Sequence, residues 1–127
     1  MEQIINFKTA ELLMDKNFDW DSNFYYDFDR DLMEFQYYEY DRNSKEYNGY
    51  PCDVCYFAPS QSLLQRWLRD VHNIIIEMNY SEYNDWQWII ISKEKEWYSQ
   101  GTNDTDDINL SYEEILEIGL QEALKLI

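Results

Sequence analysis

The clearest hydrophobic pattern in the chain covers its last residues, Ser111–Ile127. At about 100° per residue, the apolar side chains of this stretch fall on one arc of a helix. They are Tyr112, Ile115, Leu116, Gly119, Leu120, Ala123, Leu124 and Ile127, and the opposite side carries Glu114, Glu117, Gln121 and Lys125. Ser111 and Glu114 have the spacing of a capping box, in which each side chain accepts from the other residue's backbone N–H. The pattern predicts an amphipathic helix that docks on other elements.

Two further helices are predicted from the same spacing. The first runs from Phe7 to about Lys16 behind an Asn6 cap, and the second follows Pro59 and a Ser60 cap. The residues at helical intervals in the first are Ala10, Leu13 and Met14. In the second, the apolar face consists of Leu63, Leu64, Trp67, Leu68 and Val71, whereas Gln61, Gln65, Arg66 and Arg69 point elsewhere.

Between the first two helices the period changes from helical to alternating. Apolar residues take even positions, Phe18, Trp20, Phe24, Tyr26 and Phe28, and then odd positions, Met33, Phe35 and Tyr37. Alternation is typical of a half-buried strand, and the change of phase across Asp27–Asp31 (DFDRD) indicates a turn between two antiparallel strands. Asp41–Gly49 is predicted to be a polar loop, and its Asn48-Gly49 pair is a strong turn dipeptide.

A second hairpin is predicted after the second helix. His72–Tyr80 is rich in isoleucine and indicates a strand, Ser81–Asp85 a turn, and Trp86–Lys93 a strand that can continue to Tyr98. Gly101–Asn109 is an acidic loop before the last helix. The order α-β-β-α-β-β-α predicts a single α+β domain over residues 1–127. Its antiparallel sheet of about four strands would carry the three helices on one face.

Charge restricts the partners of this 127-residue chain. It has 26 acidic and 10 basic residues, and the formal net charge is −16. Nucleic acids and anionic membranes are polyanions, so binding to either is disfavoured, whereas a basic protein partner is favoured. Hydrophobic residues still make up 45%, which suits a folded core, and twelve Tyr and five Trp add side chains that suit interfaces.

The N-terminal residues give no sign of a targeting segment. MEQIINFKTAELL has an acid at Glu2, no basic start and no long apolar run. Nowhere does the sequence approach the roughly 20 apolar residues of a membrane helix. We therefore expect a cytoplasmic protein, with Cys52 and Cys55 as reduced thiols.

Cys52 and Cys55 form a C-x-x-C pair. A zinc site needs two further ligands, and His72 is the only histidine, so one chain cannot complete a Cys/His site. Carboxylate ligands, or a site shared in a dimer, are the remaining routes to a metal. A redox pair should open a helix, but the predicted helix starts only after Pro59. Structural cysteines are therefore favoured over a metal or redox role.

Neither His72 nor the basic residues of the second helix indicate a site. A single histidine at a helix–strand junction is typical of a structural residue, and no motif gives it a nucleophile or carboxylate partner. In so acidic a chain, Arg66 and Arg69 are interpreted as ion-pair partners of nearby acids.

The acidic clusters depart from known calcium motifs. Asp27-x-Asp29-x-Asp31 begins like an EF-hand loop, but Leu32 stands at position six and Tyr38 at position twelve. Asp19-x-Asp21-x-Asn23 fails in the same way, with Phe24 and Arg30. Asp104, Asp106 and Asp107 precede a helix, where acids interact favourably with the helix dipole. These clusters are interpreted as turns and solvated faces.

Two stretches carry a family resemblance. Ala58–Asp70 (APSQSLLQRWLRD), followed by His72-Asn73-Ile74, and Tyr112–Ile127 (YEEILEIGLQEALKLI) resemble a family of short, uncharacterised proteins from Bacteroidales phages and integrated mobile elements. That family shares an A-P-T-Q-S-L-L-Q-x-W-L-R core and a Y-E-E-A-L-x-x-G-L-x-E-A-L end, which here have Ser60 and Ile115 in place of Thr and Ala. The first helix (TAELLMDKNF) matches more loosely and the middle of the chain does not match. The resemblance implies a related fold and a phage or mobile-element origin, and therefore the cytoplasm of a bacterial host cell. It implies no activity and no catalytic residue.

These observations assign no catalytic, cofactor-binding or metal-binding residue and no cofactor. They predict a small acidic non-enzymatic module that binds another protein, because Tyr and Trp are typical binding anchors when exposed. One alternative is an acidic nucleic-acid mimic that inhibits a host DNA-binding or defence protein. A second is a structural homo-oligomeric subunit that buries aromatic surface. The sequence leaves the partner's identity and the oligomeric state open.

Overall fold

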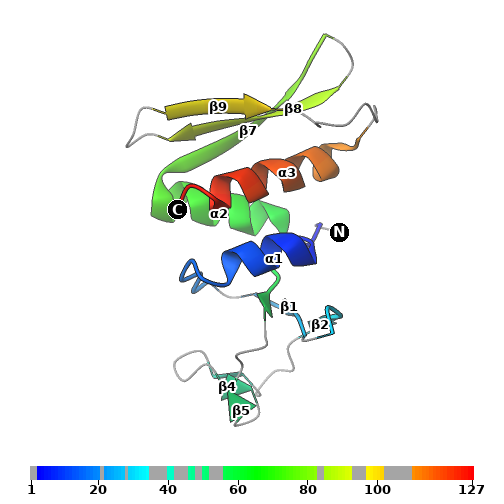
Figure 1. The fold of residues 1–127 in the computed structure, drawn as a ribbon, viewed down its shortest axis with the longest axis vertical. Coiled ribbons are helices and arrows are strands. Elements are labelled where there is room, and N and C mark those ends of the chain that lie inside the picture. Colours follow the sequence, from blue (N-terminus) through cyan, green and yellow to red (C-terminus); the bar gives the residue numbers. More distant parts are fainter. Residues whose placement is uncertain are drawn as a thin grey trace. The chain divides into compact units, whose positions relative to one another are not determined.

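A computed structural model describes most of the chain as two compact units, Ile4–Pro59 and Ser60–Ile127 with Met1–Gln3. The residues it describes are 3–20, 22–27, 29–34, 40–41, 46–47, 50–51, 56–82, 85–92, 97–101 and 110–127. They form three helices and nine strands, which confirms the α+β class (Figure 1). Their strands make three antiparallel sheets of three strands each, instead of one sheet of about four. That residues 1–127 are a single domain stays a prediction.

The unit Ile4–Pro59 begins with helix α1, Phe7–Leu13. As predicted, Asn6 caps it, because its Oδ1 accepts from the Thr9 backbone N–H at 3.0 Å. The helix ends before the predicted Lys16, and Met14 is 42% exposed while Leu13 is buried. The apolar face of α1 therefore stops one residue short of the predicted set.

Strands β1 (Phe24–Tyr26), β2 (Leu32–Glu34) and β6 (Tyr56–Phe57) form a sheet in the order β2-β1-β6. The predicted turn between β1 and β2 is confirmed: Asp27 N–H donates to the Asp31 carbonyl at 3.0 Å, and Asp27 Oδ1 accepts from the backbone N–H groups of Asp29 and Asp31. Asp27 thus serves as a turn residue.

The predicted phase of β1 is wrong, because Tyr25 is the buried residue of the strand and Phe24 and Tyr26 are half-buried. The pattern counted Phe18 and Trp20 as part of the strand, which begins only at Phe24. Their parity therefore does not fix which face of β1 is buried, although Phe18 is itself buried.

A third sheet overlaps the predicted polar loop Asp41–Gly49. Strands β3 (Tyr40–Asp41), β4 (Glu46–Tyr47) and β5 (Tyr50–Pro51) pair in that order, so this part of the loop prediction is wrong. Tyr47 lies opposite both Tyr40 and Tyr50, and such tyrosine pairs favour strand over loop. Phe35, Tyr37 and the predicted Asn48-Gly49 turn lie outside the described residues.

The second unit starts with helix α2, Gln61–His72, which Ser60 caps as predicted. Asn73 ends it in the left-handed conformation, and strand β7 begins directly afterwards at Ile74 and runs to Tyr80. Strand β8, Trp86–Ser92, does not continue to Tyr98 as the sequence allowed, because the chain reverses. A separate strand β9, Trp97–Gly101, pairs with β8 antiparallel, Ser92 lying opposite Trp97.

Helix α3, Tyr112–Leu124, carries the predicted capping box between Ser111 and Glu114. Together with α2 it packs on one face of the β7-β8-β9 sheet (Figure 1). The buried apolar residues of this layer are Leu64, Trp67, Leu68, Ile74, Ile76, Trp88, Ile90, Ile115, Leu116, Leu120, Ala123 and Leu124. The predicted docking arc is confirmed at its centre, with Tyr112 and Ile127 half-buried at its ends.

Glu117 corrects the prediction for the polar side of α3. It is buried, at 8% exposed, because Gln61 at the start of α2 donates from Nε2 to its Oε1 at 3.0 Å and to the Glu113 carbonyl at 2.8 Å. Gln61 was predicted to point away from the core and is 4% exposed. A polar contact between two helices therefore replaces solvent at both positions.

Candidate functional site

The β7–β8 hairpin extends beyond its sheet. Strand β8 pairs with β7 along its whole length, from Ser92 opposite Ile74 to Trp86 opposite Tyr80. It pairs with β9 only from Ser92 to Trp88. Among the described residues, the hairpin tip (79–82 and 85–87) therefore consists of two strands that continue past the end of β9. The described residues of this tip exclude Tyr83 and Asn84.

Three aromatic rings meet edge to face here, two on the tip and one in α3. Tyr80 and Trp86 lie opposite each other across the hairpin, with ring centroids 4.9 Å apart and planes at 64°. Trp86 in turn meets Tyr112 of α3 at 5.0 Å and 88°. We call Tyr80, Trp86 and Tyr112 the tip cluster. Edge-to-face pairs of this kind contribute about 0.5–1.5 kcal/mol each beyond the area they bury.

The tip cluster is fixed at one end and open at the other. Tyr112 is the first residue of α3, and the capping box of Ser111 and Glu114 holds that helix start in place. Trp86 and Tyr112 are half-buried, whereas Tyr80 is 53% exposed, more than any other large hydrophobic side chain in the described part of the chain. The cluster therefore presents the Tyr80 ring on a rigid support.

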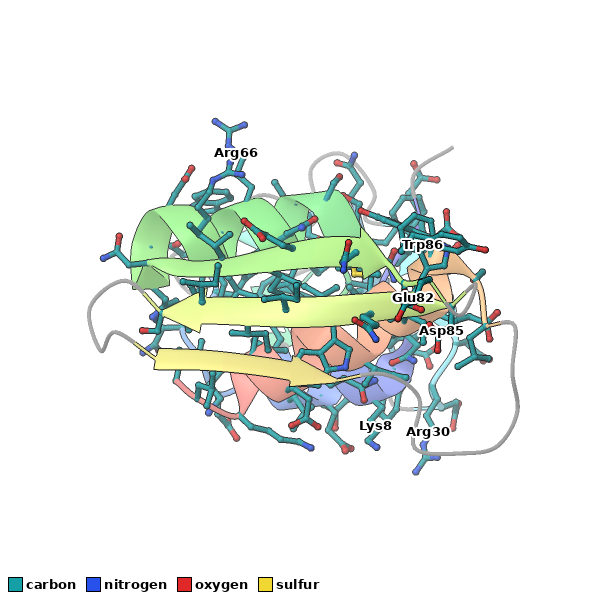
Figure 2. All side chains as sticks on the ribbon, turned by 90° about the horizontal axis from the view of Figure 1, so that it is seen from above. Lys8, Arg30, Arg66, Glu82, Asp85 and Trp86 are labelled. Atoms are coloured by element: carbon teal, nitrogen blue, oxygen red, sulfur yellow. The ribbon has the colours of Figure 1, made fainter. Side chains whose placement is uncertain are left out.

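The predicted turn Ser81–Asp85 is confirmed and orders the acids beside the cluster. Ser81 N–H donates to the Asp85 carbonyl at 2.8 Å, and the Ser81 hydroxyl donates to Asp85 Oδ1. Glu82 is exposed in the same turn. Figure 2 shows Glu82, Asp85 and Trp86 gathered at one end of the sheet.

The charged residues nearest to the tip in the sequence are acids. Lys93 and Lys95 are the only Lys or Arg residues in the sequence between Val71 and Leu124. Both follow β8, whereas the tip precedes it and joins its first residue, Trp86. The first turn of α3, which holds Tyr112, carries Glu113 and Glu114. The described charged residues of the hairpin turn and of the first turn of α3 are therefore all acids.

None of the residues first considered for chemistry belongs to the tip cluster. Cys52 and Cys55 lie outside the described residues, as do Asp104, Asp106 and Asp107. His72 ends α2 at the predicted helix–strand junction, and its ring packs on Trp67 with centroids 4.7 Å apart. Over the described ranges, no three His, Cys, Asp or Glu side chains come together to hold a metal ion.

The basic side chains of α2 are engaged with an acid of the same helix. Arg66 Nε lies 3.4 Å and Arg69 Nε 3.3 Å from the carboxylate of Asp70. This confirms the interpretation of both arginines as ion-pair partners. All three side chains are exposed, so these pairs contribute little to stability.

Sequence reasoning predicted the strands and the turn of the hairpin but missed the tip cluster. Tyr80 and Trp86 flank the turn symmetrically, and that symmetry is the signal that predicts a cross-strand aromatic pair. Tyr112 joins them only through the packing of α3 on β8, which no spacing in the sequence reveals.

No protein-family model, no curated protein and no solved structure matches this chain. None of the helices in the described ranges has the length and apolar character needed to cross a membrane.

Proposed function

We propose that this protein is a non-enzymatic module that binds another protein through the tip cluster. The observation that carries the proposal is the 53% exposure of Tyr80 on a hairpin that continues past the last described residue of β9. Tyr and Trp are enriched among the residues that supply most of the binding energy at protein interfaces. A tyrosine already ordered by Trp86 and Tyr112 loses little conformational freedom on binding.

The resemblance to proteins of Bacteroidales phages and mobile elements supports a bacterial protein as the partner. Affinity capture from a Bacteroidales lysate tests the proposal when the wild-type chain is compared with a Trp86→Leu variant. We expect one specific partner that the variant captures at least about fivefold less well, because Trp86 positions the Tyr80 ring. Capture that is equal for both chains, or no specific partner with either, would contradict the proposal.

A structural homo-oligomeric subunit is the second candidate, and the outer face of the β7-β8-β9 sheet favours it. Ile74, Ile76 and Ile90 are buried toward the helices, so the alternate residues point to the opposite face. On that face Ile75 lies opposite Ile91, next to Ile89, and all three are half-buried. Figure 2 looks onto these strands with α2 and α3 behind them. The nucleic-acid mimic stays a prediction from net charge.

A further inference from the structure

We infer that the partner of the tip cluster presents an arginine side chain, which stacks on the Tyr80 ring and pairs with the carboxylate of Glu82. This inference rests on the proposed function and names the chemistry of the partner. Its basis is an exposed aromatic ring, Tyr80, and an exposed acid, Glu82, two residues apart on one hairpin tip whose nearest charged residues in the sequence are acids.

The hairpin tip favours a cationic group of the partner over an apolar one. An aromatic ring attracts a cation to its face through its quadrupole, and nearby carboxylates strengthen that preference. Tyr80 is followed by Glu82 and Asp85, and Glu113 and Glu114 follow Tyr112 in α3. An apolar partner surface would have to cover these acids and remove their hydration without replacing it, which is unfavourable.

Among cationic side chains, the tip favours arginine over lysine. A guanidinium is planar, stacks on an aromatic face and still presents N–H donors in its own plane to a carboxylate. Glu82 is exposed, so its carboxylate is accessible to such a donor from solvent. An ammonium has no flat face and is more strongly hydrated, so it gains less from Tyr80.

Asp85 and Trp86 hold the two contacting residues, Glu82 and Tyr80, in position. Asp85 Oδ1 accepts from the Ser81 hydroxyl, so that acid also orders the turn that carries Glu82. Trp86 packs between Tyr80 and Tyr112, so its role is to position the Tyr80 ring. Glu82 and Tyr80 are therefore the residues that contact the partner.

The test is a titration of the full chain with a short fluorescently labelled peptide of Arg-Gly-Ser repeats, followed by anisotropy. Matched peptides carry citrulline, which keeps the shape of arginine without its charge, or lysine. We expect the arginine peptide to bind, the citrulline peptide to bind at least about tenfold more weakly, and the lysine peptide to fall between them. Binding should weaken as salt rises from about 50 to about 300 mM.

Variants locate the contact. Tyr80→Leu should weaken the arginine peptide about fivefold, whereas Tyr80→Phe keeps the ring and should bind like wild type. Glu82→Gln should weaken it about threefold, and Glu122→Gln, which makes the same change of net charge near the other end of α3, should leave it unchanged. Circular dichroism and thermal unfolding confirm that each variant is folded.

Several results would overturn the inference. They are no binding of the arginine peptide, equal binding of the citrulline peptide, equal losses in Tyr80→Leu and Tyr80→Phe, or equal losses in Glu82→Gln and Glu122→Gln. A different result would reject the arginine inference without rejecting the proposed function. A captured partner that depends on Trp86 but is not displaced by the arginine peptide would leave the function standing and reject arginine as the recognised group.

Discussion

Gly119 has no side chain because Trp88 occupies the space where one would lie. A Cβ at this position would lie 2.9 Å from Trp88 Cβ and 3.5 Å from Ile76 Cγ2. Since Trp88 Cβ is held close to the backbone of β8, the strand and α3 would have to separate. The glycine that lowers the helix propensity of α3 thus permits its close approach to the sheet.

Replacing this glycine should destabilise the protein. Gly119→Ala gains about 1 kcal/mol of helix propensity but overpacks a dense contact, so we expect a net loss of about 1 kcal/mol in the free energy of unfolding. Denaturant unfolding measures it. The exposed helix position Glu113→Ala serves as control and should change stability by less than about 0.5 kcal/mol. A Gly119→Ala variant more stable than wild type would contradict the close contact.

The buried pair of Gln61 and Glu117 leads to a second prediction. Gln61→Leu removes the donor to the Glu117 carboxylate and the Glu113 carbonyl, which should cost about 1–3 kcal/mol. Adding Glu117→Met removes the buried carboxylate and should recover part of that loss. Equilibrium unfolding of the two single variants and the double variant gives the coupling. Additive losses would show that the two side chains do not interact.

Spacing in the sequence identified the apolar arc of α3 but misplaced Glu117. A carboxylate on the polar side of a helix is solvated unless a neighbour covers it, and the neighbour here comes from α2, more than fifty residues earlier in the sequence. Helical periodicity contains no information about such a partner. Gly119 was placed correctly on the arc, whereas its contact with Trp88 depends on how α3 crosses β8.

Helix starts and turns were predicted best where a side chain bonds to the backbone of a residue close to it in the sequence. Asn6, Ser60 and Ser111 each cap the helix predicted for them, and Asp27 makes the predicted turn. These interactions span two to four residues, so the sequence alone contains both partners. Strands of two or three residues, such as β3 and β4, contain too few positions to show a period.

The junction between α2 and β7 gives a prediction at the element scale. Asn73 has φ of 55° and its N–H donates to the Leu68 carbonyl, a left-handed helix end that Gly and Asn tolerate. Asn73→Ala should therefore be less stable than Asn73→Gly by about 1 kcal/mol. Thermal or denaturant unfolding of the pair measures the difference. Equal stability of the two variants would show that the left-handed conformation is not maintained.

The whole molecule carries a net charge of −16, and this charge bears on its oligomeric state. Two copies that met through the isoleucines of the outer sheet face would bring two such charges together. We therefore expect light scattering at low salt to give the mass of a single chain. A dimer that Ile89→Lys converts to monomer would instead favour the structural-subunit candidate, since Ile89 lies on that face.

If a partner docks on the hairpin tip, site-specific photo-crosslinking from position 80 should attach it covalently to this chain. Benzoylphenylalanine would replace Tyr80 in one variant and Val71 in another, because Val71 is 49% exposed on α2 and matches the 53% exposure of Tyr80. After irradiation in a bacterial lysate, we predict one discrete adduct from position 80 and none from position 71. The same adducts from both positions, or none from position 80, would show that no partner docks on the hairpin tip.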